Sequence, residues 1–334
     1  MGRFIIRRTL GALLVLVVVS IITFGVFMAV PSITHPNVYS RLYAGKVASE
    51  AQVEAISHKL GFDKPLYEQY LIYMKGIFTG REFSSGTQTV ECPAPCLGYT
   101  FTRHANVTEL ISEKFWITFS LCIGAAVIWL VMGISIGVIS ALKRGSLVDR
   151  AAMGFALMGV SLPTFFIGNI LLLIFSYQLG WFPNVHYVPF TENPALWAQN
   201  LFLPWMTIAL ISSALYARLM RANMLETMSE DYIRTARAKG LTRRRVVVKH
   251  GMRAALTPIV TIFGLDLGLL LGGAIITETG FNLPGLGRLA LYAIVCKDVA
   301  LIVGAIILGV VDTGVANVVV DIFYSVLDPR VRLQ

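Results

Sequence analysis

Three aspartates stand in apolar parts of the sequence, where an ionisable side chain is costly. Asp321 lies near the end of its stretch and can pair with Arg330, but Asp266 and Asp312 lie deeper. A carboxylate at membrane depth usually faces a cavity or a partner, and two carboxylates that share a proton can activate water. These residues therefore suit hydrolysis by a carboxylate pair, or contact with the amino end of a solute that crosses the membrane.

Hydrolysis would make the chain an intramembrane aspartyl protease, and Asp312-Thr313-Gly314 matches the aspartic-protease tripeptide. However, Asp266 stands in the run GLDLG and not in Gly-x-Gly-Asp, the context that such proteases use. Val47 stands where a phosphate loop needs Ser or Thr, and neither HExxH nor Gly-x-Ser-x-Gly occurs. We therefore predict no catalytic residue, no metal site and no ATP hydrolysis on this chain. The candidates for a translocation path or gate are Asp266, Glu278 and Asp312.

Residues 229–241 form the most polar stretch and predict a short capped helix. Ser229 is a good N-cap, acids follow it, bases occupy the last turn, and Gly240 can take the left-handed conformation that ends a helix. Thr242 could then begin a second helix. Ala236 and Gly240 are four residues apart and form one face without bulk, which is typical of a helix that docks into a groove on a partner. The alternative is a solvated basic loop at the membrane surface.

Composition places the chain in the membrane class. It has 334 residues, of which 56% are hydrophobic and only 14% charged, which is too apolar for a soluble globular protein. A helix that crosses a bilayer needs about 17 to 25 mostly apolar residues. The sequence therefore predicts an all-α integral membrane protein with six transmembrane helices. We expect them at residues 10–30, 116–142, 152–177, 203–219, 257–277 and 300–324.

The basic residues are distributed unevenly between the two sides of these helices. With both termini in the cytoplasm, 18 of the 28 Lys and Arg but only five of the 19 Asp and Glu fall on the cytoplasmic side. Ten of those bases lie between residues 218 and 253. Because basic loops stay in the cytoplasm, both termini are predicted to be cytoplasmic. Orientation and anionic lipid explain the basic excess without a nucleic acid partner.

The chain divides into three parts on these expectations. Residues 1–30 form a first transmembrane helix, uncleaved because its apolar run is long and no small-x-small site follows it. Residues 31–114 form a larger first extracytoplasmic loop domain. Residues 115–334 form a five-helix core that carries the basic segment 218–256 on its cytoplasmic side.

The cysteines suggest one small disulfide loop in the extracytoplasmic domain. Cys92 and Cys96 are close in sequence, and outside the cytoplasm such a pair is more often a disulfide than a metal site. Cys122 and Cys296 should be unpaired.

Small residues recur along two of the predicted helices. Gly133 and Gly137 belong to the second helix, and Gly264, Gly268 and Gly272 belong to the fifth. Such ridges let helix backbones approach closely in lipid. They predict close packing within the chain, a seam against a second membrane subunit, or both.

Three runs resemble the permease subunits of ABC importers for dipeptides and oligopeptides. LYARLMR at 215–221, followed by DYIRTARAKGL at 231–241, resembles the coupling loop of that family, although Arg234 stands where the wider motif opens with Glu. GGAIITETGFNLPGLG at 272–287 resembles the outer turn before its last helix. VDIFYSVLDPRVR at 320–332 resembles its tail.

The resemblance implies that the polar helix docks into a cleft of an ATPase subunit. It also implies a second homologous permease subunit, two ATPase domains or subunits that bind ATP and Mg²⁺, and an extracytoplasmic binding protein. These would move peptides through a bacterial inner (plasma) membrane by alternating access, with no cofactor on this chain. An importer of a nickel chelate or another solute, an exporter and a channel are the alternatives. The residues implied to couple are Tyr232, Arg234, Thr235, Ala236, Lys239, Gly240 and Leu241.

Overall fold

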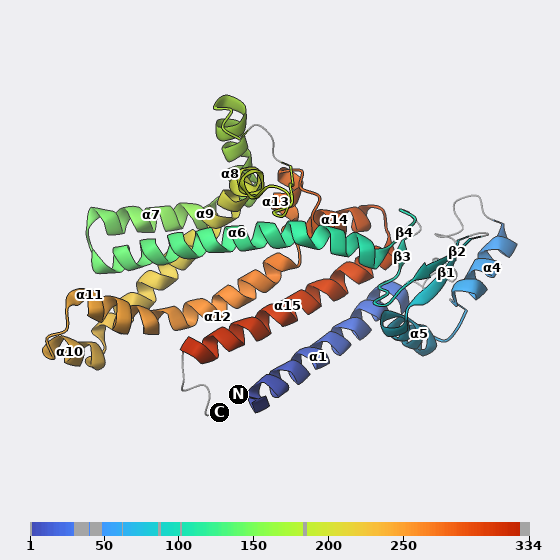
Figure 1. The fold of residues 1–334 in the computed structure, drawn as a ribbon, viewed down its shortest axis with the longest axis horizontal. Coiled ribbons are helices and arrows are strands. Elements are labelled where there is room, and N and C mark those ends of the chain that lie inside the picture. Colours follow the sequence, from blue (N-terminus) through green and yellow to red (C-terminus); the bar gives the residue numbers. More distant parts are fainter. Residues whose placement is uncertain are drawn as a thin grey trace. The chain divides into compact units, whose positions relative to one another are not determined.

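The computed structural model describes residues 2–29, 40, 49–61, 63–85, 88–100, 102–182 and 186–327. The predicted tail from Asp328 onward, including Arg330, and most of residues 30–48 of the predicted outer domain lie outside the described residues. Helices dominate (Figure 1), which confirms the all-α class. The chain forms two compact units. Unit 1 comprises Met1–Ile6, Ile117–Arg288 and Asp312–Gln334, and unit 2 comprises Arg7–Trp116 and Leu289–Val311.

Unit 2 combines helices with two small antiparallel sheets. β1 pairs with β2 so that Phe83 lies opposite Val90, and β3 pairs with β4. Phe83 stacks on Tyr99 with ring centroids 5.9 Å apart, in a small core that includes Cys92 and Cys96. The first elements in this part of the chain are α1 (Gly2–Phe24), the π-helical η1 (Gly25–Ala29), α4 (Glu50–Leu60), α5 (Leu66–Thr79), β1 (Arg81–Ser85), β2 (Gln88–Cys92), β3 (Tyr99–Thr100) and β4 (Ala105–Asn106).

Two later helices, α14 (Leu286–Val295) and α15 (Val299–Leu327), also contribute to unit 2. Asp298 lies between them and accepts hydrogen bonds from the hydroxyls of Thr100 and Thr102, the latter at 2.6 Å. The guanidinium of Arg103 lies 4.0 Å from the ring centroid of Tyr292. The turn around β3 and β4 is therefore tied to the α14–α15 junction by a carboxylate and a cation–π contact.

Unit 1 holds most of the long apolar helices. Many of them pack on α9, which is buried along much of its length. The elements of this part of the chain are α6 (Val107–Leu142), α7 (Leu147–Ser161), α8 (Thr164–Leu171), η2 (Leu172–Gln178), α9 (Pro194–Ser229), α10 (Asp231–Ala238), α11 (Arg243–Arg245), η3 (Val246–Gly251), α12 (Met252–Leu271) and α13 (Ile275–Gly280).

Five described helices are long and apolar enough to cross a membrane, or six when one bent pair counts as a span. The predicted helix at 152–177 is wrong as one straight helix, because α7 and α8–η2 meet at 107°. Leu162, between them, has an extended backbone with φ −94° and ψ 133°. Pro163 causes the break, since proline lacks an N–H group and disfavours the helical conformation of the residue before it.

The predicted span at 257–277 also ends early. α12 stops at Leu271, and α13 is a separate short helix. Gly273 lies between them with a φ of 127°, and a Cβ there would lie 2.7 Å from the Cα of Gly287. Only glycine permits both this conformation and this close approach.

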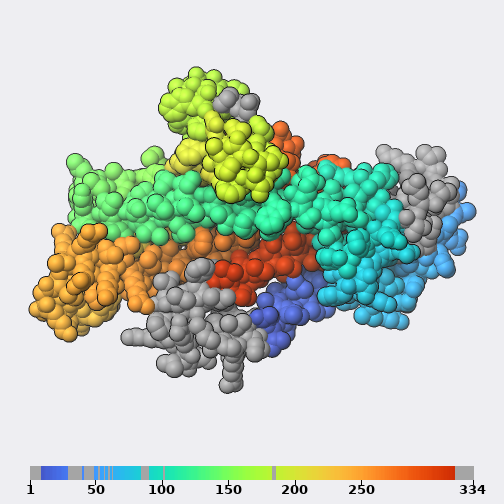
Figure 2. All heavy atoms as spheres, viewed as in Figure 1, coloured from blue at the N-terminus to red at the C-terminus, as the bar shows by residue number. Residues whose placement is uncertain are grey.

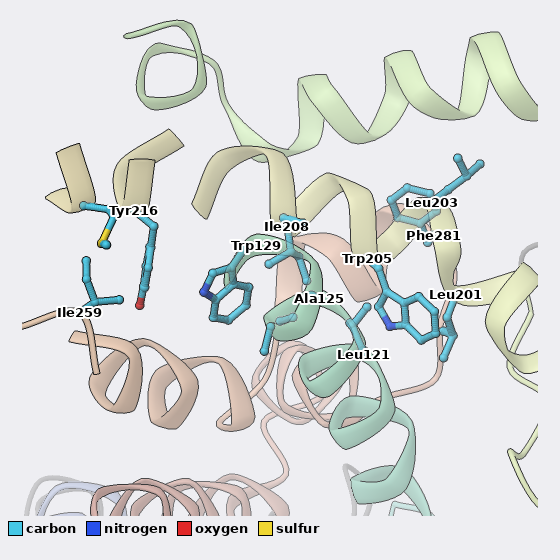
Figure 3. Close-up of a cluster of buried hydrophobic side chains, with 14 of the residues drawn as sticks. Leu121, Ala125, Trp129, Leu201, Leu203, Trp205, Ile208, Tyr216, Ile259 and Phe281 are labelled. Carbon is cyan, nitrogen blue, oxygen red and sulfur yellow. The ribbon is translucent and has the colours of Figure 1, made fainter. Parts of the chain in front are cut away.

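The main core of unit 1 lies between α6, α9 and α12. Figure 3 shows Trp129 and Tyr216 side by side in this core, and their ring centroids are 6.1 Å apart. The glycine ridge of α6 belongs to the same packing, because a Cβ on Gly133 would lie 2.6 Å from the Cβ of Tyr216. On α12, a Cβ on Gly268 would lie 3.3 Å from the Cα of Thr313. At these glycines the ridges serve close packing within the chain.

Candidate functional site

The polar segment folds into a short helix that starts later than predicted. α10 follows α9 after the single residue Glu230, whose φ of −65° and ψ of 149° are extended. Ser229 is not the N-cap, because it is the last residue of α9 and its hydroxyl donates to the carbonyl of Glu226 at 2.7 Å. Glu230 takes that position without a side-chain cap bond. Asp231 in the first turn and Arg237 in the last turn suit the helix dipole, as predicted.

α10 has one face packed on the chain and one face open. Ile233 is fully buried and Ala236 is 7% exposed, and both pack in one cluster with Val246. Ala236 therefore lies on the inner face, contrary to the prediction that it forms an open bare face with Gly240. Among the other predicted coupling residues, Leu241 is half-buried and these are exposed: Tyr232, Arg234, Thr235, Lys239 and Gly240.

The end of α10 and the start of the next helix follow the sequence prediction in part. Gly240 has a φ of 75°, which confirms the left-handed conformation. A Cβ there would meet no atom within 4 Å, so the position needs glycine for its conformation and not for space. Thr242 precedes α11 but makes no side-chain cap bond. α11 runs without a break through η3 into α12.

A pocket of about 480 Å³ lies behind α10, at the ends of α6 and α9. Its lining includes Ala141 of α6, Met224 and Met228 of α9, Arg237 of α10 and Val247 of η3. Figure 2 shows the orange atoms of this part of the chain against the green end of α6 and α7. The predicted coupling segment and the α6–α7 turn therefore lie at the same end of unit 1.

Asp149 of α7 forms the densest polar contact at this end. Its carboxylate is 5% exposed and accepts two hydrogen bonds from Arg221 of α9, Nε to Oδ1 at 2.6 Å and Nη2 to Oδ2 at 2.8 Å. The hydroxyl of Ser140 and the backbone N–H of Gly145, at 2.9 Å, donate to it as well. Such two-pronged pairs are among the strongest hydrogen bonds in proteins. Sequence reasoning missed this site, because its partners are 72 residues apart and carry no local signal.

Glu278 of α13, a predicted path or gate residue, is completely buried. Its carboxylate accepts from the hydroxyl of Thr118 at 2.6 Å and from the backbone N–H of Arg288 at 2.9 Å. Thr118 in turn accepts from the N–H of Leu286 at 2.8 Å. Burial raises the pKa of Glu278, and the hydrogen bonds from Thr118 and the backbone offset part of that rise. In this structure Glu278 fastens the start of α14 to α6, and its role in a path or gate stays a prediction.

The two deep aspartates have different surroundings. Asp266 of α12 accepts a hydrogen bond from the hydroxyl of Tyr216 at 2.8 Å. Asp312 of α15 is 8% exposed, and its Oδ2 has no hydrogen-bond partner among the residues that the structure describes. Asp266 is thus held by a neighbouring helix, and Asp312 is a buried carboxylate with an unpaired oxygen. Their roles in a path or gate stay predictions.

The cysteines and possible metal ligands complete the list of predicted sites. An S–S bond of 2.08 Å joins Cys92 to Cys96, and Cys122 and Cys296 are unpaired. Within the described part of the chain, no group of three or more His, Cys, Asp or Glu could hold a metal ion.

The comparison with protein families decides the class. Residues 133–333, which include α9, α10 and α12, match the family described as "Binding-protein-dependent transport system inner membrane component". The chain belongs to this family. Residues 1–122 of the permease match the N-terminal part, described as "Binding-prot-dependent transport system membrane comp, N-term". The permease is therefore an ABC transporter subunit that crosses the bacterial inner membrane several times, as the sequence predicted.

Curated relatives align with the permease over its whole length. A Brucella abortus (strain 2308) protein named "Putative peptide transport system permease protein" is 37% identical over 99% of both chains. The "Glutathione transport system permease protein GsiC" of Escherichia coli (strain K12) is 35% identical over 100% of both chains. A solved structure titled "Crystal structure of an amino acid ABC transporter with histidines" is 20% identical, covers 65% of the permease and 94% of that chain, and has a TM-score of 0.47.

Proposed function

We propose that this permease is one of two membrane subunits of an importer for dipeptides and oligopeptides, including tripeptides the size of glutathione. Its partners would be a second homologous permease, two ATPase domains and an extracytoplasmic binding protein that delivers the peptide. ATP and Mg²⁺ would bind to the ATPases. Relatives named for peptide and glutathione transport, aligned over nearly the whole chain, support the peptide class.

The observation that carries this proposal is the two-faced helix α10. Its inner face, Ile233 and Ala236, packs on Val246 and fixes the helix to the permease. Its outer face presents Tyr232, Arg234 and neighbouring polar groups without an apolar cover. A helix with a fixed inner side and an open charged side suits docking into a groove of a soluble partner.

The connections of α10 support a lever mechanism. α10 joins α9 through Glu230 on one side and joins α12 through the continuous α11–η3 segment on the other. α9 and α12 also contact each other, since the Asn223 side chain donates to the carbonyl of Ala255 at 3.2 Å. A partner that displaces α10 would therefore move two membrane helices together. The phosphoryl chemistry belongs to the ATPases, and the permease supplies the path and the lever for alternating access.

Substitutions that add bulk or reverse a charge at the open side of α10 test this proposal. The complex, co-purified with its ATPases and second permease, would be placed in vesicles and supplied with its binding protein. We expect Gly240→Trp and Arg234→Glu to lower uptake by about tenfold or more while the helices stay inserted. Gly180→Trp is the matched control for bulk, because Gly180 also has a positive φ of 64° and no atom within 4 Å of a Cβ.

The outcomes separate the docking role from the cargo. Normal uptake by both α10 variants would disprove docking through this helix. Glutathione and trialanine are the transport probes. If the complex hydrolyses ATP in response to its loaded binding protein but carries neither probe, the peptide class is wrong and the importer role stands.

A further inference from the structure

The start of α7 has a single buried side chain, that of Asp149. Leu147 is 80% exposed, and the following residues up to 155 are exposed or half-buried apart from Asp149. The next buried residue in α7 is Ala156. The turn residues 143–145 are exposed as well. Asp149 is therefore the one buried polar anchor of the first two turns of α7, in addition to the packing of α7 along α9.

Asp149 holds these segments to the part of α9 that leads into the coupling helix. Its partner Arg221 lies nine residues before Glu230, at which α9 gives way to α10. One carboxylate thus joins α6 through Ser140, the turn through Gly145 and α9 through Arg221. Because Asp149 is buried and the contact is two-pronged, separating the charges would leave a buried carboxylate without its cation. The start of α7 should therefore follow the end of α9 when α9 moves.

We propose that the Asp149–Arg221 pair transmits the displacement of α10 to the α6–α7 hairpin. Both are positioning residues and touch no solute. This inference rests on the proposed coupling role of α10. Apolar contacts hold the last turns of α6 on α9, as at Gly137 against Met220, and the end of α7 on α9, as at Gly159 against Ala214. The ion pair adds a buried polar attachment at the start of α7.

A purely structural role makes a different prediction from a transmitting role. A structural pair would lower the amount of assembled complex and its unfolding temperature, while each surviving complex would carry the usual number of solutes per ATP. A transmitting pair would lower the number of solutes carried per ATP in complexes that remain assembled. The ratio of transport to ATP hydrolysis therefore distinguishes the two.

The test uses the complete complex in vesicles with its binding protein, with glutathione and trialanine as transport probes. We expect Asp149→Asn and Arg221→Gln to keep ATP hydrolysis and to lower transport per ATP by about tenfold. Arg221→Lys keeps the charge but loses the planar two-pronged contact, so it should lower the ratio by about threefold. If the neutral variants fail to assemble, Arg221→Lys still tests the proposal, because it keeps the positive charge. Arg150→Gln is the matched control, because it removes an exposed guanidinium one residue from Asp149 and leaves the pair intact.

Gly240→Trp, measured beside these variants, separates this proposal from the one it rests on. A wild-type ratio in the Asp149 and Arg221 variants, beside an uncoupled Gly240→Trp, overturns the transmitting role alone. An equal fall in Arg150→Gln also overturns it, since any lost charge at the start of α7 would then suffice. A normal ratio in Gly240→Trp overturns the coupling role of α10 and this proposal with it.

Discussion

Two buried carboxylates of unit 1 are held in opposite ways. Asp149 is paired with the guanidinium of Arg221, a long side chain from another helix. Glu278 accepts from the Thr118 hydroxyl and from backbone N–H groups at the start of α14, and among the described side chains no cation pairs with it. The Glu278 contact joins residues close to it in the local fold, while the Asp149 contact joins α7 to a separate long helix, α9, through a salt bridge. The comparison identifies the Glu278 site as a joint within the local fold and the Asp149 site as a joint between two helices.

The largest predicted effect tests how fixed the Glu278 joint is. In Gly285→Ala, the new Cβ would lie 2.4 Å from the Cδ of Glu278, whose buried carboxylate could move away only by disturbing its hydrogen bonds to Thr118 and Arg288. We expect the variant to lower the free energy of unfolding by about 3 kcal/mol. Thermal unfolding of the purified permease in detergent, followed by tryptophan fluorescence, measures it.

The control for this prediction is Gly280→Ala in α13, where a Cβ would meet no atom within 4 Å. It should unfold within about 0.5 kcal/mol of the wild type. If both variants lost the same unfolding free energy, any added methyl group in this segment would be destabilising, and the contact with Glu278 would not be the cause.

Removing the carboxylate itself should have a smaller effect. Glu278→Ala leaves the Thr118 hydroxyl and the Arg288 N–H buried without their acceptor, so we expect a loss of about 2 kcal/mol. Glu278→Gln keeps one acceptor oxygen and should lose less than half of that. Equal losses in the two variants would mean that the hydrogen bonds at this joint contribute little.

The same site should make stability depend on pH. Because burial raises the pKa of Glu278 above its ordinary 4.5, the folded permease binds this proton more tightly than the unfolded chain does. The resulting stabilisation is complete below pH 4.5 and is lost as pH rises through the raised pKa. The stability of the wild type relative to Glu278→Gln should therefore fall as pH rises, and a constant difference would contradict the raised pKa.

The two deep aspartates differ in their hydrogen bonds: Asp266 accepts one from Tyr216, and Asp312 Oδ2 has no partner among the described residues. Asp312→Asn removes a buried charge, so we expect a gain of about 1 kcal/mol in unfolding free energy. Asp266→Leu should act in the opposite direction, because it leaves the Tyr216 hydroxyl without its acceptor. A loss of stability in Asp312→Asn would indicate that a partner compensates this carboxylate.

The smallest effect should come from an exposed ion pair. Lys64 and Glu68 in unit 2 are 2.9 Å apart and both are open to water. Glu68→Gln should change the free energy of unfolding by less than about 0.5 kcal/mol, because solvent screens such a pair. If Glu68→Gln changed the free energy of unfolding as much as Glu278→Ala does, burial would not explain why the two sites differ.

The sequence predicts the long helices of this permease better than the places where one helix ends and the next begins. Hydropathy places the spans, and Gly240 marks the end of α10, because both signals are local. The 107° bend at Pro163 was missed because apolar residues continue through it and conceal a proline that is visible in the sequence. Ser229 has the right chemistry for a cap, but α9 simply continues through it.

The buried contacts could not be predicted because their partners are distant in sequence. Thr118 lies 160 residues from Glu278, and Arg221 lies 72 residues from Asp149. The spacing of Ala236 and Gly240 suggested a common open face, but the packing of Ile233 on Val246 turns Ala236 inward. The resemblance predicts that this segment couples to an ATPase, and only the fold shows which side of it is open.

The length of α9 bears on how the permease tolerates different membranes. At about 1.5 Å per residue, its 36 residues extend for roughly 54 Å. The hydrocarbon core of a bilayer is about 30 Å thick. Thickening or thinning of the lipid would therefore change which residues of α9 meet the headgroups, at a modest energetic cost. Since Arg221 and Glu230 belong to one continuous stretch of chain, hydrophobic mismatch need not alter the separation between the ion pair and α10.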